Sequence, residues 1–160
     1  MSAIAIVVIG VIVVVALFVL GGAIWFAWDS DKRVRAFAHS TDLIPGKPGR
    51  APDEWASATS PEALLHRRIR YAIADVHQVP GIASSPAQLA ERDRLDQAVF
   101  GLDDQLIAAA ELDGDDKTER LAQIEAAIVE LEGLPSTLWD APEQQRSDDL
   151  EAVITAIDRA

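Results

Sequence analysis

The feature that most constrains this chain is an uninterrupted apolar run near its start. Residues 3–24 carry only apolar side chains and glycine, and the first 28 residues carry no charged side chain. A helix rises about 1.5 Å per residue, so the run covers about 33 Å, enough to cross a hydrocarbon core of about 30 Å. A core helix of a soluble domain has a polar stripe, and this run has none. It predicts a transmembrane helix within residues 1–28.

A cleaved signal peptide is the alternative interpretation of this run, and it fits less well. Signal peptides begin with a cationic stretch, have a shorter apolar part of about 7–15 residues and end in small residues at a cleavage site. Here no Lys or Arg precedes the run, and the run is longer. The chain also has no cysteine, which excludes disulfides and a lipidated cysteine anchor.

Aromatic and then cationic side chains follow the run directly. Tryptophan and phenylalanine are typical of the headgroup level, and lysine and arginine beside a span favour the cytoplasmic side. No Lys or Arg lies on the N-terminal side. We therefore expect the N-terminus outside the cell membrane and the C-terminal domain in the cytoplasm. The predicted membrane-anchoring residues are Trp25, Phe26, Trp28, Lys32, Arg33 and Arg35.

Charge divides the rest of the chain into two parts. Residues 29–70 hold eight Lys and Arg against six Asp and Glu, whereas residues 71–160 hold six against twenty. Anionic lipid attracts the first part and repels the second. Nucleic acids need clustered cations, which the acidic part lacks. The pattern predicts an acidic domain that stands clear of the bilayer and has no nucleic-acid partner.

Residues 29–60 are predicted to be a basic flank followed by an extended linker. Three prolines and two glycines within residues 38–60 disfavour a helix there. Leu43, Ile44 and Trp55 lie in the same segment, although a purely flexible spacer has no need of a tryptophan. We expect this segment to pack, either on the distal domain or on a second protein.

Helical signals recur through residues 61–160. Ser-Pro pairs at Ser60 and Ser85 are typical helix starts, with serine as the N-cap and proline in the first turn. Apolar residues then recur at spacings of three and four, as in the set Leu95, Val99, Leu102, Leu106 and Ala109. A third helix is predicted to end at Gly133, and a last helix closes the chain. No alternating strand pattern occurs beyond the apolar run.

These elements together predict an all-α protein: an N-terminal transmembrane helix, a Pro-rich linker and an antiparallel three- to four-helix bundle over residues 61–160. Whether the last helix joins the bundle stays open at this point. Short connections favour antiparallel neighbours, and breaks near Pro80, Pro86, Gly114 and Pro135 favour a folded-back bundle over a long rod.

Signals for chemistry are weak. His66 and His77 lie eleven residues apart, on nearly the same helix face, but they do not form the H-E-x-x-H zinc motif. The acidic turn at Asp113 lacks the glycine and the bidentate glutamate of a calcium loop. Phosphate-binding loops and nucleophile elbows are absent from the sequence. We therefore expect no enzyme activity, no cofactor and no metal site.

One basic cluster, "HRRIR", begins at His66. Its arginines Arg67, Arg68 and Arg70 cannot all face the core. They are expected either to pair with acids of neighbouring helices or to contact anionic lipid or an acidic partner. With Trp55, these three arginines are the predicted partner-contact residues.

The stretch "TDLIPGKPGRAPDEWASATSPEALLHRRIRYAIADV", residues 41–76, resembles a segment of small, uncharacterised actinobacterial single-pass membrane proteins. The resemblance lies in Leu-Pro-Gly-like, Arg-Ala-Pro and Trp-Ala steps followed by Pro-Glu-Ala-x-Leu-His-Arg-Arg. It implies that the linker and the first helix form one unit, and it implies no catalytic residue.

Two functions are consistent with these features. The first is a non-enzymatic single-pass membrane protein that acts as an accessory subunit or scaffold for another membrane protein. The second is a self-associating coiled-coil protein of the envelope or division machinery, in which the apolar stripes would continue between chains.

Overall fold

The computed structural model describes residues 42–160, which belong to one compact unit. The predicted transmembrane helix of residues 1–28 lies outside the described residues, as do the six predicted membrane-anchoring residues. Among residues 42–160, no helix combines the length and the apolar character that crossing a bilayer requires.

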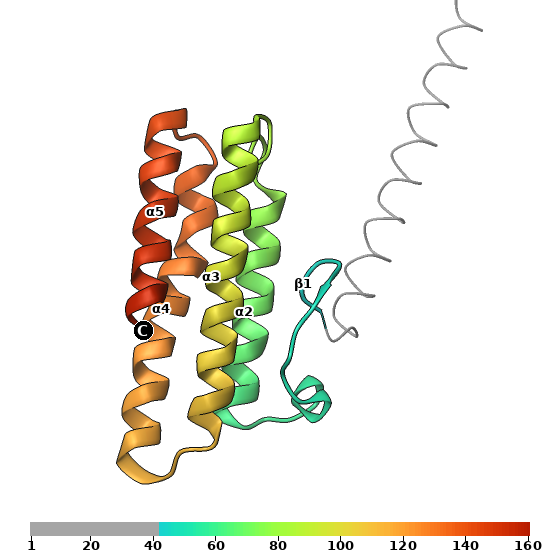
Figure 1. The fold of residues 1–160 in the computed structure, drawn as a ribbon, viewed down its shortest axis with the longest axis vertical. Coiled ribbons are helices and arrows are strands. Elements are labelled where there is room, and N and C mark those ends of the chain that lie inside the picture. The colour runs from blue at the N-terminus through green and yellow to red at the C-terminus, as the bar shows by residue number, and fades with distance from the viewer. Residues whose placement is uncertain (1–41) are drawn as a thin grey trace, which may run out of the picture. The chain divides into compact units, whose positions relative to one another are not determined.

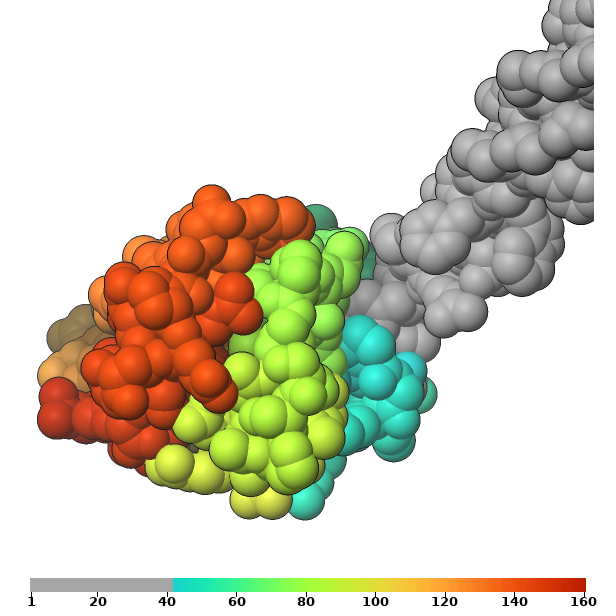
Figure 2. All heavy atoms as spheres, turned by 90° about the horizontal axis from the view of Figure 1, so that it is seen from above, coloured from blue at the N-terminus to red at the C-terminus, as the bar shows by residue number. Residues whose placement is uncertain are grey.

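Four helices make up most of the described chain, which confirms the predicted all-α bundle (Figure 1). They are α2 (Pro61–Gln78), α3 (Pro86–Ala110), α4 (Gly114–Leu138) and α5 (Glu143–Arg159). Helix α2 packs against α3 and α4, and α5 packs against the same two helices. The last helix therefore completes a four-helix bundle, whose close packing is visible end-on in Figure 2.

The helix starts follow the local chemistry of the sequence. The Ser60 side chain accepts a hydrogen bond from the backbone N–H of Ala63, with Pro61 in the first turn of α2. Ser85 forms a full capping box with Gln88 at the start of α3. Both caps satisfy backbone donors that a helix start leaves without partners. The two predicted Ser-Pro starts are confirmed.

The apolar stripes meet in a single core. Leu102 and Leu106 of α3 and Ile128 and Leu131 of α4 have no solvent exposure. Leu150 and its neighbours on α5 are also buried in this core. The predicted helical phase of these elements is therefore correct, and each helix buries its stripe within one chain.

Helix α4 extends beyond its predicted end. It continues through Gly133 and Pro135 to Leu138, five residues past the predicted C-cap. Proline costs the helix a backbone hydrogen bond. Continuation of the helix buries Leu134 and Leu138 in the core, and this burial favours the longer helix.

The predicted linker contains ordered elements. Strand β1 (Asp42–Ile44) pairs antiparallel with β2 (Lys47–Pro48), and a short 3-10 helix, η1 (Asp53–Ala56), follows. Gly46 makes the turn possible because its φ of 80° lies in the left-handed region. The expectation of no sheet is wrong for this small hairpin, which is too short to give an alternating pattern. We call residues 42–58 the strap.

Candidate functional site

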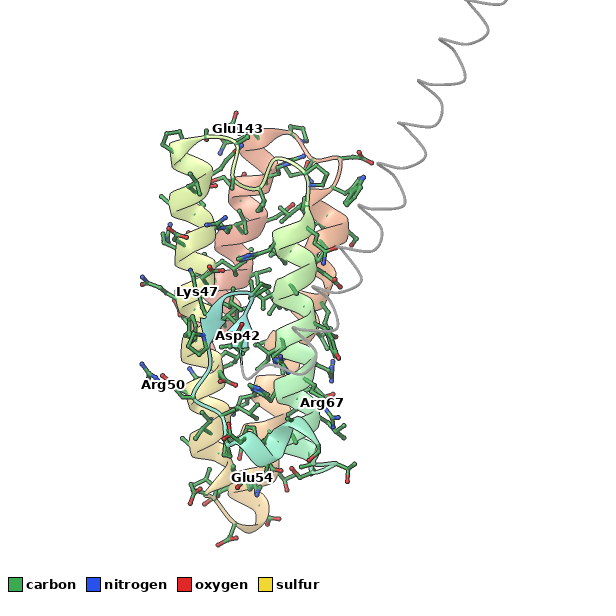
Figure 3. All side chains as sticks on the ribbon, turned by 90° about the vertical axis from the view of Figure 1, so that its right-hand side faces the viewer. Asp42, Lys47, Arg50, Glu54, Arg67 and Glu143 are labelled. Carbon is green, nitrogen blue, oxygen red and sulfur yellow. The ribbon has the colours of Figure 1, made fainter. Side chains whose placement is uncertain are left out.

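The strap lies along the face formed by α2 and α3, as Figure 3 shows. Leu43 and Ile44 have no solvent exposure, and Trp55 is only 8% exposed. The indole of Trp55 meets the imidazole of His66 edge-on, with ring centroids 5.8 Å apart and an interplanar angle of 64°. Of the two expectations for this segment, packing on the distal domain is the one observed.

A buried hydrogen bond between two helices lies beneath Trp55. His66 Nδ1 of α2 is 2.6 Å from Asp103 Oδ1 of α3, and both side chains are almost fully buried. A carboxylate can only accept, so the imidazole Nδ1 carries the proton and donates. The pair joins two helices at a depth where either group alone would be costly to bury.

A second buried carboxylate ties the strap to the bundle. Asp96 Oδ1 lies 2.7 Å from His77 Nε2, and Asp96 Oδ2 accepts from Lys47 Nζ at 2.8 Å. Burial alone would raise the pKa of Asp96, but the hydrogen bonds from His77 and Lys47 outweigh it and lower the pKa below its ordinary value. Asp96 therefore holds α2, α3 and the strap hairpin together.

Two arginines of the basic cluster bind carbonyl groups of the strap. Arg70 Nε donates to the backbone oxygen of Asp42 at 2.7 Å, and Arg67 Nη2 donates to that of Ala58 at 2.6 Å. Arg70 is buried, and burial lowers the pKa of its guanidinium group. The two bonds fix both ends of the strap, at positions that Figure 3 labels Asp42 and Arg67.

The third arginine points toward α4 instead. Arg68 Nε and Nη2 donate to the two carboxylate oxygens of Glu132 at 2.8 and 2.9 Å, and Arg68 Nη1 donates to Glu125 at 2.6 Å. This bidentate geometry raises the pKa of Arg68 and lowers that of Glu132. The expected pairing with acids of neighbouring helices is thus observed for Arg68, whereas Arg67 and Arg70 bind backbone oxygens of the strap.

The described histidines and acids form pairs instead of a convergent centre. His66 and His77 contact two different aspartates and do not form a shared site. Within residues 42–160, no group of three His, Cys, Asp or Glu side chains is placed to hold a metal ion. These pairs stabilise the arrangement of α2, α3 and the strap.

An apolar groove remains open between the first halves of α2 and α4. Its volume is about 670 Å³, and Leu64, Leu65, Leu121 and Ala122 are among its lining residues. Leu64 is 48% exposed although it is large and apolar. The ion-paired Arg68 and Glu125 close one side of this groove. Grooves of this kind can accept an apolar helix face.

Sequence reasoning missed the two buried aspartates and Lys47. A usable signal was present, because Asp96 and Asp103 occupy positions of the apolar stripe: Asp96, Val99, Asp103 and Leu106 are spaced three, four and three. A carboxylate on a core stripe indicates a buried partner, since an unpaired buried charge is strongly unfavourable. The two histidines of α2 were the available partners.

Comparison of the chain with protein-family models, with curated proteins and with solved structures finds no match. The resemblance of residues 41–76 to small actinobacterial membrane proteins therefore stays a prediction.

Proposed function

We propose that this chain is a non-enzymatic, single-pass membrane protein whose helical bundle acts as an accessory subunit or scaffold for another membrane protein. The observation that supports this proposal most directly is the packing of the strap on the bundle. The segment that connects the predicted span to the bundle is held by a buried tryptophan, by two arginine-to-backbone bonds and by the Lys47–Asp96 ion pair.

The packed strap shortens the stretch of chain between the predicted span and the bundle. Thirteen residues, 29–41, separate the predicted span from the strap, and an extended chain of that length reaches at most about 45 Å. With a packed strap, these thirteen residues are the stretch of sequence between the predicted span and the ordered part of the chain. A bundle attached in this way is suited to a partner in the same membrane, because the short connection limits its distance from the predicted span.

The arrangement of the stripes favours the scaffold over a self-associating coiled coil. Leu102, Leu106, Ile128 and Leu131 are buried among the helices of one chain. Apolar stripes that are already buried within one chain leave no continuous apolar surface on the described helices for a second copy to pack against. The coiled-coil alternative would need the same residues to face outward.

Topology and membrane attachment can be tested on the full chain. We expect the protein to stay in the membrane fraction after an alkaline carbonate wash. A reporter that functions only in the cytoplasm should be active when it is fused after Ala160, and a reporter that functions only outside should be silent. Recovery in the soluble fraction, or activity only from a reporter that requires the outside, would contradict the proposed function. Co-purification from native membranes would then identify the partner of a protein that passes both tests.

A further inference from the structure

The strap is attached to the bundle by few buried side chains. Of its seventeen residues, Leu43, Ile44 and Trp55 are buried, and the others are half-buried or exposed. Ordering the backbone costs conformational entropy at every one of these positions, buried or not. Segments with few buried apolar contacts open at a lower free energy than the core of the same protein. The strap therefore has the composition of a segment that opens before the bundle unfolds.

The backbone hydrogen bonds of the strap join strap residues to one another. Strand β1 pairs with β2, and the N–H groups of Trp55 and Ala58 donate to the carbonyl groups of Pro52 and Glu54. Because these bonds lie within the strap, they do not have to break when the strap leaves α2 and α3. The strap can thus move as a unit.

The ion pairs between the strap and the bundle involve cations that already contact water. Lys47 Nζ is 2.8 Å from Asp96 Oδ2, and the lysine side chain is 46% exposed. Arg50 Nη1 is 2.8 Å from Asp104 Oδ2, and these two side chains are 76% and 45% exposed. Both cations become fully hydrated when the strap opens, so opening buries no charge.

The buried carboxylates beneath the strap keep a partner when it opens. Asp96 is bonded to His77, and Asp103 is bonded to His66. Both histidines belong to α2, so these two bonds do not depend on the strap. An unpaired buried charge is strongly unfavourable, and opening of the strap creates none at either aspartate. The α2–α3 face is therefore suited to the open state as well as to the closed one.

We propose that the strap is a two-state lid, which detaches from α2 and α3 as a unit while the four helices stay folded. The closed state is the more populated one, so the strap still adds to the stability of the described chain. A partner that binds only the open state would shift the population toward it.

Opening has a consequence for the attachment of the bundle. Thirteen residues separate the predicted span from the closed strap, whereas thirty residues, 29–58, separate it from the bundle once the strap is open. The greatest reach of the connection then rises from about 45 Å to about 105 Å. This consequence rests on the proposed single-pass attachment, whereas the opening itself does not.

Thiol labelling of the full chain in a mild detergent tests the lid, because the chain has no cysteine of its own. Leu43→Cys places a thiol in the strap, Leu102→Cys places one in the helical core, and both leucines have no solvent exposure. A buried thiol reacts with N-ethylmaleimide only when the structure opens around it. Rates in unfolding urea correct for the intrinsic reactivity of each thiol. We expect position 43 to react at least about 100-fold faster than position 102, because the strap opens without global unfolding.

A lysine variant gives a second readout in the Leu43→Cys background. Lys47→Gln should raise the labelling rate about 5- to 10-fold, because it removes a charged hydrogen bond that holds the strap closed. Lys117→Gln is the matched control, since Lys117 of α4 also pairs with a buried carboxylate, that of Glu62, at 2.6 Å. The control should change the rate at position 43 by less than about twofold, because neither residue belongs to the strap.

Three outcomes would overturn the lid. Equal corrected rates at positions 43 and 102 would show that the strap opens only with global unfolding. Labelling of position 43 at the rate of the unfolded chain would show that the strap is not closed in solution. Equal effects of the two lysine variants would show that contacts of the strap do not control the opening. Ile128→Cys, also without exposure, replaces Leu102→Cys if circular dichroism shows that the latter is unfolded.

Failure of the lid and failure of the proposed function are distinguishable. A chain in the soluble fraction with fast labelling at position 43 retains the lid and loses the membrane scaffold, together with the change in connection length. A membrane-bound chain with equal rates at positions 43 and 102 retains the proposed function and loses only the lid.

Discussion

Asp96 is the residue through which pH acts most directly on the strap. Its folded-state pKa lies below the ordinary value of 3.8, because the hydrogen bonds from His77 and Lys47 outweigh the effect of burial. A group with a lowered folded pKa stabilises the fold above its unfolded pKa, and this stabilisation is lost as pH falls through the folded value. Glu62, bonded to Lys117, and Glu132, bonded to Arg68, act in the same direction.

Replacing Asp96 with Asn should therefore lower the free energy of unfolding at pH 7 by about 2 kcal/mol. The loss should shrink below about pH 4, where the Asp96 carboxylate of the unfolded chain begins to bind protons, and should be smallest below the lowered folded-state pKa. Urea unfolding of the isolated domain between pH 2.5 and 7 measures both effects. Asp104→Asn is the matched control, because the Arg50–Asp104 pair is largely exposed and contributes about 0–1 kcal/mol. Equal losses for the two variants at pH 7 would show that burial does not strengthen the Asp96 site.

Leu102 tests the core at the same scale. It has no solvent exposure at the centre of α3, so Leu102→Ala should cost about 2–5 kcal/mol of unfolding free energy. Leu89→Ala on the same helix is the control, with an expected change within about 0.5 kcal/mol, because Leu89 is well exposed. Chemical denaturation of both variants measures the difference. A loss below 1 kcal/mol for Leu102 would place that side chain outside the packed core.

At the scale of elements, the strap should behave as part of the bundle. A chain that begins at Thr41 should be more stable than one that begins at Ser60, because only the first retains the buried Leu43, Ile44 and Trp55. Burial of such side chains contributes about 1.5–3 kcal/mol each before the entropy of ordering is subtracted. Thermal melting of the two chains measures the contribution of the strap. Equal melting temperatures would show that the strap does not stabilise the bundle.

A substitution within the strap separates packing from chain length. Trp55→Ala should cost about 3–5 kcal/mol, since the buried indole packs on His66. Trp139→Ala is the matched control, because Trp139 is exposed after the end of α4 and should change stability by about 0.5 kcal/mol or less. Denaturation curves for both variants measure the two losses of unfolding free energy. Similar costs for the two tryptophans would contradict the specific role of Trp55.

The elements also show which structural features were predictable from the sequence. The helix starts and the apolar stripes were predicted because they depend on local signals, namely Ser-Pro caps and apolar residues spaced three and four positions apart. The end of α4 was mispredicted because burial of Leu138, a tertiary effect, overrides the local signals of Gly133 and Pro135. The hairpin of the strap depends on bonds to distant residues such as Asp96 and Arg70, which local patterns do not encode. The groove depends on which helices become neighbours, and the sequence leaves that open.

At the scale of the whole molecule, the distribution of charge supports the predicted membrane topology. Cations gather beside the apolar run, and acids accumulate toward the C-terminus. The first group favours retention on the cytoplasmic side, and the second is repelled by anionic lipid.

The topology should depend on three cations. Changing Lys32, Arg33 and Arg35 together to Gln removes the charge difference across the predicted span, so we expect a mixture of the two orientations. Paired reporters after Ala160, one active inside and one active outside, measure the two fractions. Arg159→Gln is the control, because this arginine lies in the last turn of α5 and is far along the chain from the span. A single retained orientation in the triple variant would show that something other than these cations determines the topology.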